Sequence, residues 1–431
     1  MTNNISHKQN RSKAYVIFPS LADSAIRLSP EARLEEACGL ALAINLEVVG
    51  SEVVKLRTVK PSTFLGQGIL DKLSVLIAAQ EIDLLIIDNS LTPIQQRNLE
   101  KKLNIKVIDR TALILEIFGE RAKTREGKLQ VELAHLNYQR SRLVRSWTHL
   151  ERQRGGAGFL GGPGETQIEL DRRIIDDKIV KIKKELEKVR QTRNLQRGAR
   201  RRIPYPVVAL VGYTNAGKST LFNRLTAANV FAQNLLFATL DPTMRRIRLP
   251  GGREVILSDT VGFISDLPHE LIMSFRATLE EVLEADIIVH VRDIANPNTL
   301  EQKKDVIAVL ESLGLKEIET QDNYIEVLNK TDLLAPEDKN RITELASRTP
   351  NRLPVSAVNG EGTDEFLRLI EQKLSASFLY KQIKVPASDG RLISWIYDNS
   401  EVTESSLDGE ILSLCIKIDP ASYSKLENRL N

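Results

Sequence analysis

The sequence predicts a multidomain α/β protein: an N-terminal α/β domain with a long antiparallel helical hairpin, a central P-loop domain of α/β type, and a small α+β C-terminal domain. Three observations predict this class. Short apolar runs alternate with helix-like segments on both sides of residues 111–202, the apolar residues within that stretch follow a helical spacing, and strand-like segments dominate after Tyr380. The predicted segments are a disordered lead (1–12), the N-terminal domain (13–110), the hairpin (111–202), the central domain (203–376) and the C-terminal domain (377–431).

The composition is that of a globular protein with more than one core. The chain has 431 residues, of which 42% are hydrophobic and 27% charged, and this length suggests two to four domains. No apolar run is long enough to cross a bilayer, the polar start lacks a signal core, and Cys38 and Cys415 match no metal spacing. We expect a cytoplasmic protein without a membrane span, and we expect a monomer.

The N-terminal domain shows the alternation of strands and helices clearly. Short buried strands are predicted for AYVIF, DLLIID and KVID, and helices for SPEARLEEACGLALAI and TPIQQRNLEKKL. This order favours a largely parallel sheet. The sequence GQG at Gly66–Gly68 is too short for a phosphate-binding loop, so no site is evident in this domain.

Residues 111–202 carry two apolar stripes with the period of a helix. The first stripe consists of Leu129, Leu133, Leu136, Leu143, Trp147 and Leu150, and the second of Ile175, Ile179, Ile182, Leu186 and Val189. Two such stripes predict an antiparallel hairpin with arms about 35 to 40 Å long. Thr166 and Glu169 fit a capping box, which predicts the start of the second helix there.

The segment between the two stripes, GGAGFLGGPGE from Gly155 to Glu165, contains the pattern G-x-G-x-x-G. That pattern binds a dinucleotide only between a buried strand and a helix, and the preceding SWTHLERQR is no such strand. We therefore interpret the glycines as a thin hairpin tip. The candidate RNA-contacting residues of the tip are Arg154, Phe159, Leu160, Arg172 and Arg173. Phe159 and Leu160 either wedge among RNA bases or fold back onto the hairpin.

Charge is distributed unevenly along the chain. The net charge is only +3, yet basic residues outnumber acidic ones between Arg140 and Arg202. This run fits either a solvated helix face with a basic linker or a surface that docks on a phosphate backbone.

The strongest motif lies in VVALVGYTNAGKSTLFNRL, where an apolar strand, the sequence G-x-x-x-x-G-K-S and an amphipathic helix follow one another. This is a P-loop in the context that it requires. Its backbone N–H groups would wrap the α- and β-phosphates, Lys218 would reach the β- and γ-phosphates, and the Ser219 hydroxyl would bind Mg²⁺. The candidate residues are Gly212, Tyr213, Thr214, Asn215, Ala216, Gly217, Lys218, Ser219 and Thr220.

Further motifs follow in the order that a GTPase needs. In ILSDTVG, Asp259 ends an apolar strand, where it can hold a Mg²⁺-bound water, and Gly262 can sense the γ-phosphate. In NKTD, the Asp332 carboxylate can accept from guanine N1–H and the 2-amino group, which adenine does not offer. The further candidate GTP-binding residues are Asp259, Thr260, Val261, Gly262, Asn329, Lys330, Thr331, Asp332, Ser356, Ala357 and Val358.

A GTPase also needs a switch threonine that meets Mg²⁺ and the γ-phosphate, and NLLFATLDPTMRR lies at the right place for it. Thr239 is the candidate and Thr243 the runner-up, with a merely structural threonine as the alternative. The candidate GTP-binding residues of this segment are Phe237, Ala238, Thr239, Leu240 and Asp241. The candidate metal ligands are Ser219, Thr239 and, through water, Asp259, and the candidate catalytic residues are Lys218, Thr239 and Gly262.

The last segment predicts a small domain with the order β-α-β-β-α. QIKVPAS, EVTESS and EILSLCIKID have the character of strands, and GRLISWIYDN and PASYSKLENRL that of helices.

The chain resembles the HflX family of ribosome-associated GTPases. The likeness rests on PSTFLGQG, DRTALILEIF, EGKLQVELAHLNYQRSRL, RGGAGFLGGPGETQIELDRR, FATLDPTMRR, DTVGFI and NKTD, which span nearly the whole chain. The resemblance implies binding to the large ribosomal subunit, with the hairpin tip directed toward ribosomal RNA near the peptidyl transferase centre, and GTP-dependent dissociation of stalled or idle ribosomes. It also supports Thr239 as the switch threonine. Arg292 departs from the family by interrupting its apolar HVVD.

Two residues bear on the rate of hydrolysis. Phe263 directly follows the D-x-x-G motif, where many GTPases have a glutamine that orients water, so slow intrinsic hydrolysis is expected. By resemblance to other GTPases with asparagine at this place, Asn215 suggests a K⁺ ion near the phosphates.

Two other functions stay open on the residues alone. The chain could be a GTP-dependent protein-binding switch whose coiled coil is an effector arm. In that case salt would not steeply weaken partner binding, and large ribosomal subunits would not stimulate GTP turnover. ATP-dependent RNA remodelling by residues 13–110 is a further alternative, although no adenine or phosphate motif lies there.

Overall fold

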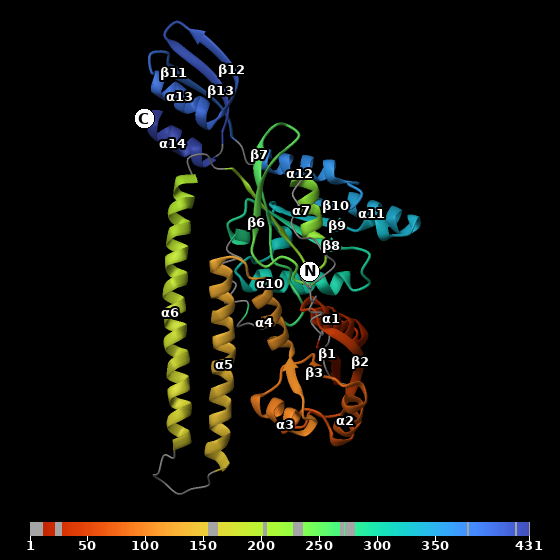
Figure 1. Cartoon of the computed structure of the whole chain (residues 1–431). Coiled ribbons are helices and arrows are strands. Elements are labelled where there is room, and N and C mark those ends of the chain that lie inside the picture. The colour runs from red at the N-terminus through yellow and green to blue at the C-terminus, as the bar shows by residue number, and fades with distance from the viewer. Residues whose placement is uncertain are drawn as a thin grey trace, which may run out of the picture. The chain divides into compact units, whose positions relative to one another are not determined.

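The computed structural model describes residues 12–21, 28–153, 163–200, 205–226, 236–267, 271, 281–376, 379–418 and 420–430. The chain divides into two compact units, one formed by Met1–Arg246 with Ile256–Glu361 and the other by Ile247–Val255 with Gly362–Asn431. Both parallel α/β sheets, the hairpin and the smaller α+β part are present, which confirms the predicted fold class (Figure 1). None of the described helices combines the length and the apolar character of a membrane span.

The N-terminal domain is built on a parallel sheet with the order β2-β1-β3-β4. Its strands are β1 (Lys13–Leu21), β2 (Glu47–Leu56), β3 (Leu84–Ile87) and β4 (Lys106–Asp109), and its helices are α1 (Pro30–Ala43), α2 (Gln67–Gln80), α3 (Pro93–Leu103) and α4 (Arg110–Arg121). The three predicted strands are confirmed. The sequence did not predict β2, because it lies at the sheet edge and only two of its ten residues are buried.

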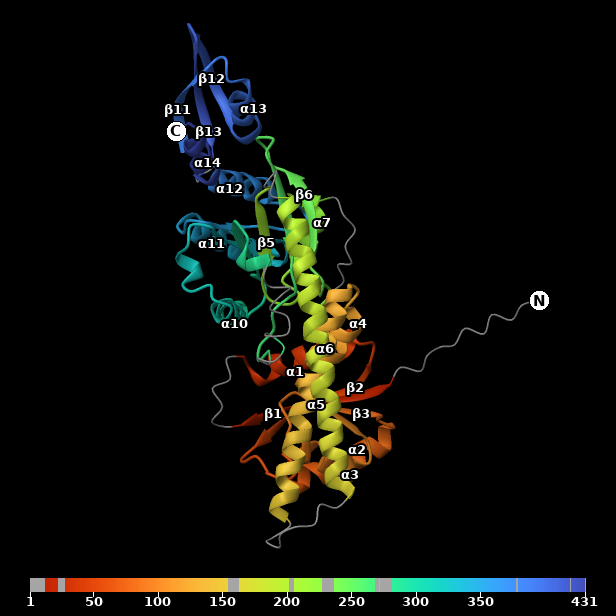
Figure 2. The same ribbon diagram turned by 90° about the vertical axis from the view of Figure 1, so that its left-hand side faces the viewer.

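The predicted hairpin is formed by α5 (Arg125–Gln153) and α6 (Pro163–Arg200), which lie side by side in Figures 1 and 2. Leu133 and Leu136 pack against Ile179 and Ile182 in a small apolar cluster. Farther along the pair, Arg140 contacts Asp176 at 3.4 Å, so residues later in α5 meet residues earlier in α6. The two helices therefore run antiparallel.

The predicted start of the second helix is wrong. Thr166 lies inside α6, which begins at Pro163, because the fixed φ of proline suits the first turn of a helix. At the tip, Arg154, Phe159 and Leu160 lie outside the described residues.

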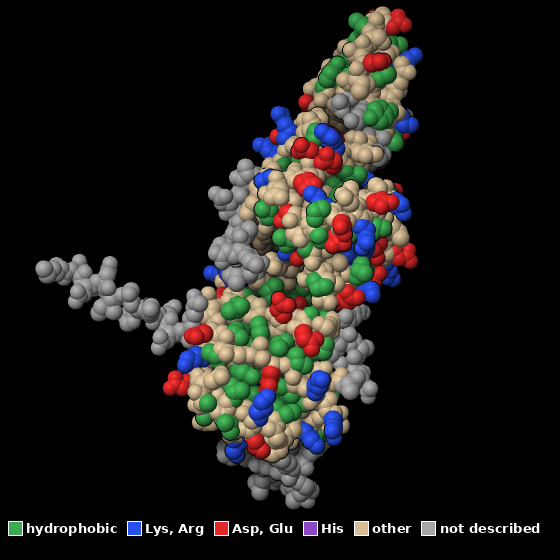
Figure 3. All heavy atoms as spheres, turned by 90° about the vertical axis from the view of Figure 1, so that its right-hand side faces the viewer, with side chains coloured by type: hydrophobic (Ala, Val, Ile, Leu, Met, Phe, Trp, Pro, Cys, Tyr) green, Lys and Arg blue, Asp and Glu red, His purple; other side chains and the backbone are tan. Residues whose placement is uncertain are grey.

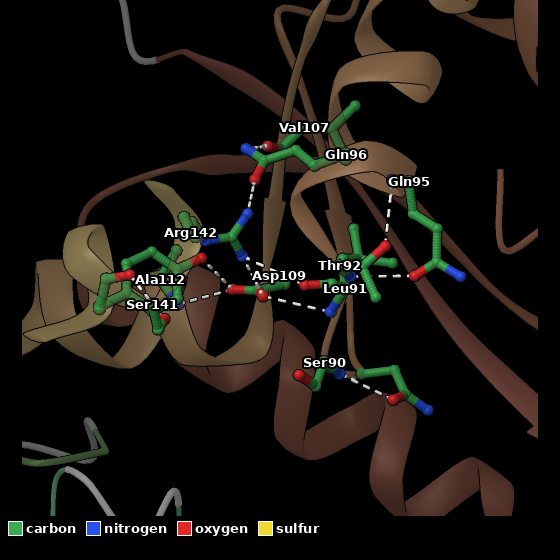
Figure 4. A network of polar contacts seen from close by, with 12 residues as sticks. Ser90, Leu91, Thr92, Gln95, Gln96, Val107, Asp109, Ala112, Ser141 and Arg142 are labelled. Carbon is green, nitrogen blue, oxygen red and sulfur yellow. Dashed lines mark hydrogen bonds and ion pairs between the residues drawn. The ribbon is translucent and has the colours of Figure 1, made fainter. Parts of the chain in front are cut away.

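A buried aspartate fastens the hairpin to the N-terminal sheet (Figure 4). The Asp109 carboxylate at the end of β4 accepts a hydrogen bond from the Arg142 guanidinium of α5 at 2.6 Å and one from the Tyr138 hydroxyl at 2.9 Å. It also accepts the backbone N–H groups of Leu91 at 3.2 Å and Ala112 at 2.8 Å. Burial, and then the negative charge of Asp109, raise the pKa of Tyr138 well above its usual value, so this hydroxyl stays a donor. Helix α5 is thereby held in one register on the sheet.

The central domain contains a sheet with the order β10-β9-β8-β5-β7-β6. Its strands are β5 (Val207–Val211), β6 (Thr243–Arg248), β7 (Glu254–Asp259), β8 (Ile287–Asp293), β9 (Tyr324–Asn329) and β10 (Arg352–Pro354). Its described helices are α7 (Lys218–Thr226), α10 (Thr299–Ser312), η1 (Ile318–Thr320), η2 (Thr331–Leu333) and α11 (Pro336–Ser347). Because β7, β5, β8, β9 and β10 pair in parallel, the segments that follow β5, β7 and β9 leave from one edge of the sheet.

Arg292, the departure from the family pattern, is accommodated by a buried carboxylate. It forms an ion pair with Glu326 on the neighbouring strand, and Glu326 also contacts Lys303 at 3.1 Å and Arg352 at 2.6 Å. Burial raises the pKa of Glu326, but the three cations more than offset this and lower it to about 2. Arg292 is therefore paired with a carboxylate on the adjacent strand of the same sheet.

The second unit contains an antiparallel sheet with the order β11-β13-β12. Its elements are α12 (Thr363–Ala376), β11 (Leu379–Pro386), α13 (Gly390–Asn399), β12 (Glu401–Asp408), β13 (Ile411–Ile418) and α14 (Pro420–Leu430). Val385, Ile396, Leu414 and Leu426 lie in its apolar core. The predicted order β-α-β-β-α is confirmed.

Candidate functional site

The P-loop joins β5 to α7 through two glycines that no other residue could replace without strain. Gly212 has φ +153°, and a Cβ there would lie 2.2 Å from the carbonyl oxygen of Val291. Gly217 has φ +92°, and a Cβ there would lie 2.1 Å from the side-chain nitrogen of Asn329. The loop therefore packs directly against the ends of β8 and β9.

Lys218 is the buried cation of the site. Its Nζ donates hydrogen bonds to the carbonyl oxygens of Gly212 at 3.0 Å and Tyr213 at 2.8 Å. Burial lowers the pKa of Lys218 to about 8, although the nearby Asp259 carboxylate acts in the opposite direction. A buried ammonium group without a full anionic partner is what a phosphate group would stabilise.

Three oxygen-bearing side chains meet at the start of α7. The Ser219 hydroxyl donates to the Asp259 carboxylate at 2.7 Å, and the Thr239 hydroxyl lies 2.9 Å from Ser219 and 3.2 Å from Asp259. The other carboxylate oxygen of Asp259 is buried and has no hydrogen-bond partner. This set of hard oxygen donors fits Mg²⁺. Thr243, the second switch candidate, begins strand β6.

Lys218, Ser219 and Thr239 line one pocket. It is lined by Thr214, Asn215, Gly217, Lys218, Ser219, Thr220, Phe237, Ala238, Thr239, Thr260 and Gly262. Gly262 approaches closely, since a Cβ there would lie 2.9 Å from the Cα of Thr214. The backbone of Gly262 therefore lies close to the P-loop, and the added Cβ would also lie 3.2 Å from Lys218 Nζ.

Asn329 links the P-loop to the segment expected to bind the base. Its side-chain amide donates to the Ala216 carbonyl at 2.8 Å and accepts from the Ala357 N–H at 3.0 Å. Beside it, the Ser356 hydroxyl donates to the Asp332 carboxylate at 2.6 Å. Lys330 contacts Asp293 at 2.7 Å. Of the other candidates here, Thr331 is buried and Val358 is exposed.

Several candidate residues contact strand β5 or the hydrophobic core next to the pocket. Thr260 donates to the Leu210 carbonyl at 2.6 Å, and Val261 and Leu240 belong to the hydrophobic core. Phe263 is also buried in this core, so its ring cannot orient a water molecule.

Other side chains of the nucleotide motifs face the N-terminal domain. The Tyr213 hydroxyl hydrogen-bonds to the Glu36 carboxylate, and the Phe237 ring meets the Phe118 ring edge-on at 4.8 Å. The Asp241 carboxylate accepts hydrogen bonds from the two residues directly before α5, although the sequence placed it among the GTP-binding candidates. Sequence reasoning missed these contacts because the partners are far apart in the chain and follow no local pattern.

We expect that Asp332→Asn weakens GTP binding and favours xanthosine triphosphate. The amide presents a donor where guanine offers donors, whereas the C2 carbonyl of xanthine accepts from it. Dissociation constants for both nucleotides test this. Unchanged GTP affinity in the variant would remove Asp332 from the base site.

We expect the protein to take up protons when it binds nucleotide near pH 8. Burial lowers the pKa of Lys218 to about 8, and a bound phosphate would raise it again because it favours the charged ammonium group. The protonated fraction falls from about nine-tenths at pH 7 to about one-quarter at pH 8.5, so affinity should fall about fourfold over this range. Calorimetry in two buffers of different ionisation enthalpy should show uptake of about half a proton at pH 8. Binding without proton uptake would contradict this state of Lys218.

The chain is similar to known GTPases over nearly its full length. The matching family models are described as GTP-binding GTPase N-terminal (31–119), GTP-binding GTPase Middle Region (121–200), 50S ribosome-binding GTPase (207–330) and HflX C-terminal domain (341–431). The GTPase HflX of Magnetococcus marinus is 46% identical, over 96% of this chain and 94% of its own length. The GTPase HflX of Escherichia coli is 42% identical, over 91% of each chain. With a P-loop, a buried lysine and a guanine motif at one sheet edge, this chain belongs to the HflX family of GTPases and hydrolyses GTP.

Proposed function

We propose that this protein is a cytoplasmic GTPase that binds the large ribosomal subunit and dissociates stalled or idle ribosomes. The observation that carries the proposal is the hairpin of α5 and α6, which is fastened by Asp109 to the same compact unit that holds the GTP site. A long, anchored pair of helices is suited to reach into a partner. Nucleotide-dependent contacts at its base would control that reach.

The charge on the hairpin supports an RNA partner. Arg172 and Arg173 are exposed on α6, close to the helix end that adjoins the tip. On the face shown in Figure 3, by contrast, acidic and basic side chains are interspersed. The matched family model is described as a ribosome-binding GTPase, which supports the same partner. In the proposal, Arg154, Phe159 and Leu160 of the tip contact ribosomal RNA near the peptidyl transferase centre.

The site residues have distinct roles in the proposed hydrolysis. Lys218 and the P-loop N–H groups bind the phosphates, and the Gly262 backbone meets the γ-phosphate. Ser219, Thr239 and, through water, Asp259 would hold Mg²⁺, which when bound neutralises charge on the phosphates. Because Phe263 is buried and apolar, an external partner must complete the arrangement that orients water. Asn215, exposed at the mouth of the loop, is the proposed neighbour of a K⁺ ion.

The structure disfavours a separate ATP site in the N-terminal domain. Ligands of open parallel sheets bind at the carboxyl edge of the strands, and here that edge carries a buried ion-pair network. The Arg110 guanidinium contacts Asp88 and Glu36, each at 2.6 Å, and donates to the carbonyl oxygen of Ser265 at 2.8 Å. Arg33 contacts the same Asp88 at 3.3 Å. This edge therefore packs on the GTPase segment.

GTP turnover by the isolated protein should be slow and should rise at least about tenfold with purified large ribosomal subunits, because an ordered partner supplies what Phe263 cannot. The stimulation should weaken as salt is raised, since phosphate contacts release counterions, and K⁺ should support faster turnover than Na⁺. Small subunits serve as the matched control. Fast turnover without subunits, equal in Na⁺ and K⁺, would contradict the proposal. Stimulation that salt leaves unchanged would favour a protein-binding switch.

Replacing Gly155–Gly162 with a short Gly-Ser linker should abolish ribosome dissociation. GTP affinity should stay unchanged because the phosphates bind at the P-loop, and much of the charge-driven subunit binding should remain. Nucleotide titration, subunit co-sedimentation and a splitting assay measure the three properties. If the shortened protein splits ribosomes at the normal rate, the tip is a passive connector.

A further inference from the structure

Asp241, two residues after the candidate switch threonine, accepts hydrogen bonds from the two residues that directly precede α5. One carboxylate oxygen accepts the backbone N–H groups of Lys123 at 2.8 Å and Thr124 at 2.9 Å. The other accepts the Thr124 hydroxyl at 2.5 Å. Three hydrogen bonds thus join the switch segment to the start of α5.

The start of α5 is built to receive this carboxylate. The Thr124 hydroxyl also accepts the Gly127 N–H at 2.9 Å, so it caps the helix and donates to Asp241 at the same time. A Cβ on Gly127 would lie 2.3 Å from the Asp241 carboxylate, so the close approach depends on glycine. The N–H groups and the dipole of the helix N-terminus favour a negative charge here.

The residues before Thr239 contact helices α1 and α4 of the N-terminal domain. The Phe237 ring packs on Phe118 of α4, and Leu236 lies over Gly39 of α1, where an added Cβ would meet it at 3.1 Å. Thr239 is therefore flanked on both sides by contacts to the N-terminal part of the unit. Its hydroxyl lies 2.9 Å from Ser219, where the metal ligands converge.

We propose that Asp241 is a positioning residue for GTP hydrolysis: the N-terminus of α5 holds its carboxylate and thereby keeps Thr239 at the metal and the γ-phosphate. The inference rests on the proposed role of Thr239. It makes the first turn of the hairpin part of the GTPase machinery. Because coupling is reciprocal, a hairpin displaced by its partner would change the position of Thr239, and loss of the γ-phosphate would loosen the hold on α5.

The test compares Asp241→Asn with wild type in the full-length protein. Asparagine keeps the shape but loses the charge and one acceptor oxygen, so kcat for GTP should fall about tenfold while KM changes less than about twofold, as expected for a group that acts after binding. Asp83→Asn is the matched control. It also removes a carboxylate that accepts a backbone N–H, that of Lys13 at 2.9 Å, but it lies in the N-terminal sheet away from the pocket.

A second variant disturbs the same contact by changing the residue that lies against Asp241. Gly127→Ala leaves Asp241 intact, suits a helix better than glycine, and places a Cβ where the carboxylate lies. If the contact only stabilises the fold, Gly127→Ala should change the melting temperature and leave kcat normal, whereas the proposal predicts a fall in kcat similar to that of Asp241→Asn. The double variant should be no slower than Asp241→Asn alone.

Thr239→Ala separates the two levels of the proposal. If Thr239→Ala loses most activity while Asp241→Asn and Gly127→Ala keep wild-type kcat, the positioning role is overturned and the role of Thr239 stands. If Thr239→Ala keeps wild-type kcat, both are overturned.

Discussion

The hydrogen bonds from Lys123 and Thr124 to the Asp241 carboxylate join the segment that carries Thr239 to the start of the hairpin. On one side of Asp241, the Thr239 hydroxyl lies 2.9 Å from Ser219 and 3.2 Å from Asp259, the residues that we propose hold Mg²⁺. On the other side, Lys123 and Thr124 lead directly into α5, the first helix of the hairpin. The donors lie directly before α5, where the dipole of the helix N-terminus also favours a negative charge. In our proposal, this contact couples the nucleotide state to the position of the hairpin.

Helix α5 is held at two points of different character. Thr124, which caps its N-terminus, contacts Asp241 in the segment that we propose as the switch, and switch segments of GTPases change on hydrolysis. Farther along the helix, Asp109 holds Arg142 and Tyr138 in a buried network that contains no nucleotide contact. A helix fixed at one point and released at another can turn about the fixed point. This arrangement gives a physical route from the γ-phosphate to the hairpin.

Sequence patterns predicted which segments form the candidate site where chemistry demands fixed residue types at short spacing. The P-loop and the segments at Asp259 and Asn329 lie at the ends of parallel strands, so the fold brings them together. Patterns failed where several residues satisfy the same local rule, as at Pro163 and Thr166, either of which can begin a helix. They could not predict the contact of Asp241 with Thr124, which joins residues 117 apart without any periodicity.

The coupling between nucleotide and hairpin can be measured directly by hydrogen exchange at the backbone amides of Lys123 and Thr124, which donate to Asp241. The exchange rates would be compared between the full-length protein bound to a non-hydrolysable GTP analogue and the same protein bound to GDP. Slower exchange of these two amides in the GTP-analogue state, with unchanged exchange around Asp109, is the predicted result. Equal exchange in both states would show that Asp241 holds α5 regardless of the nucleotide, and would contradict the coupling.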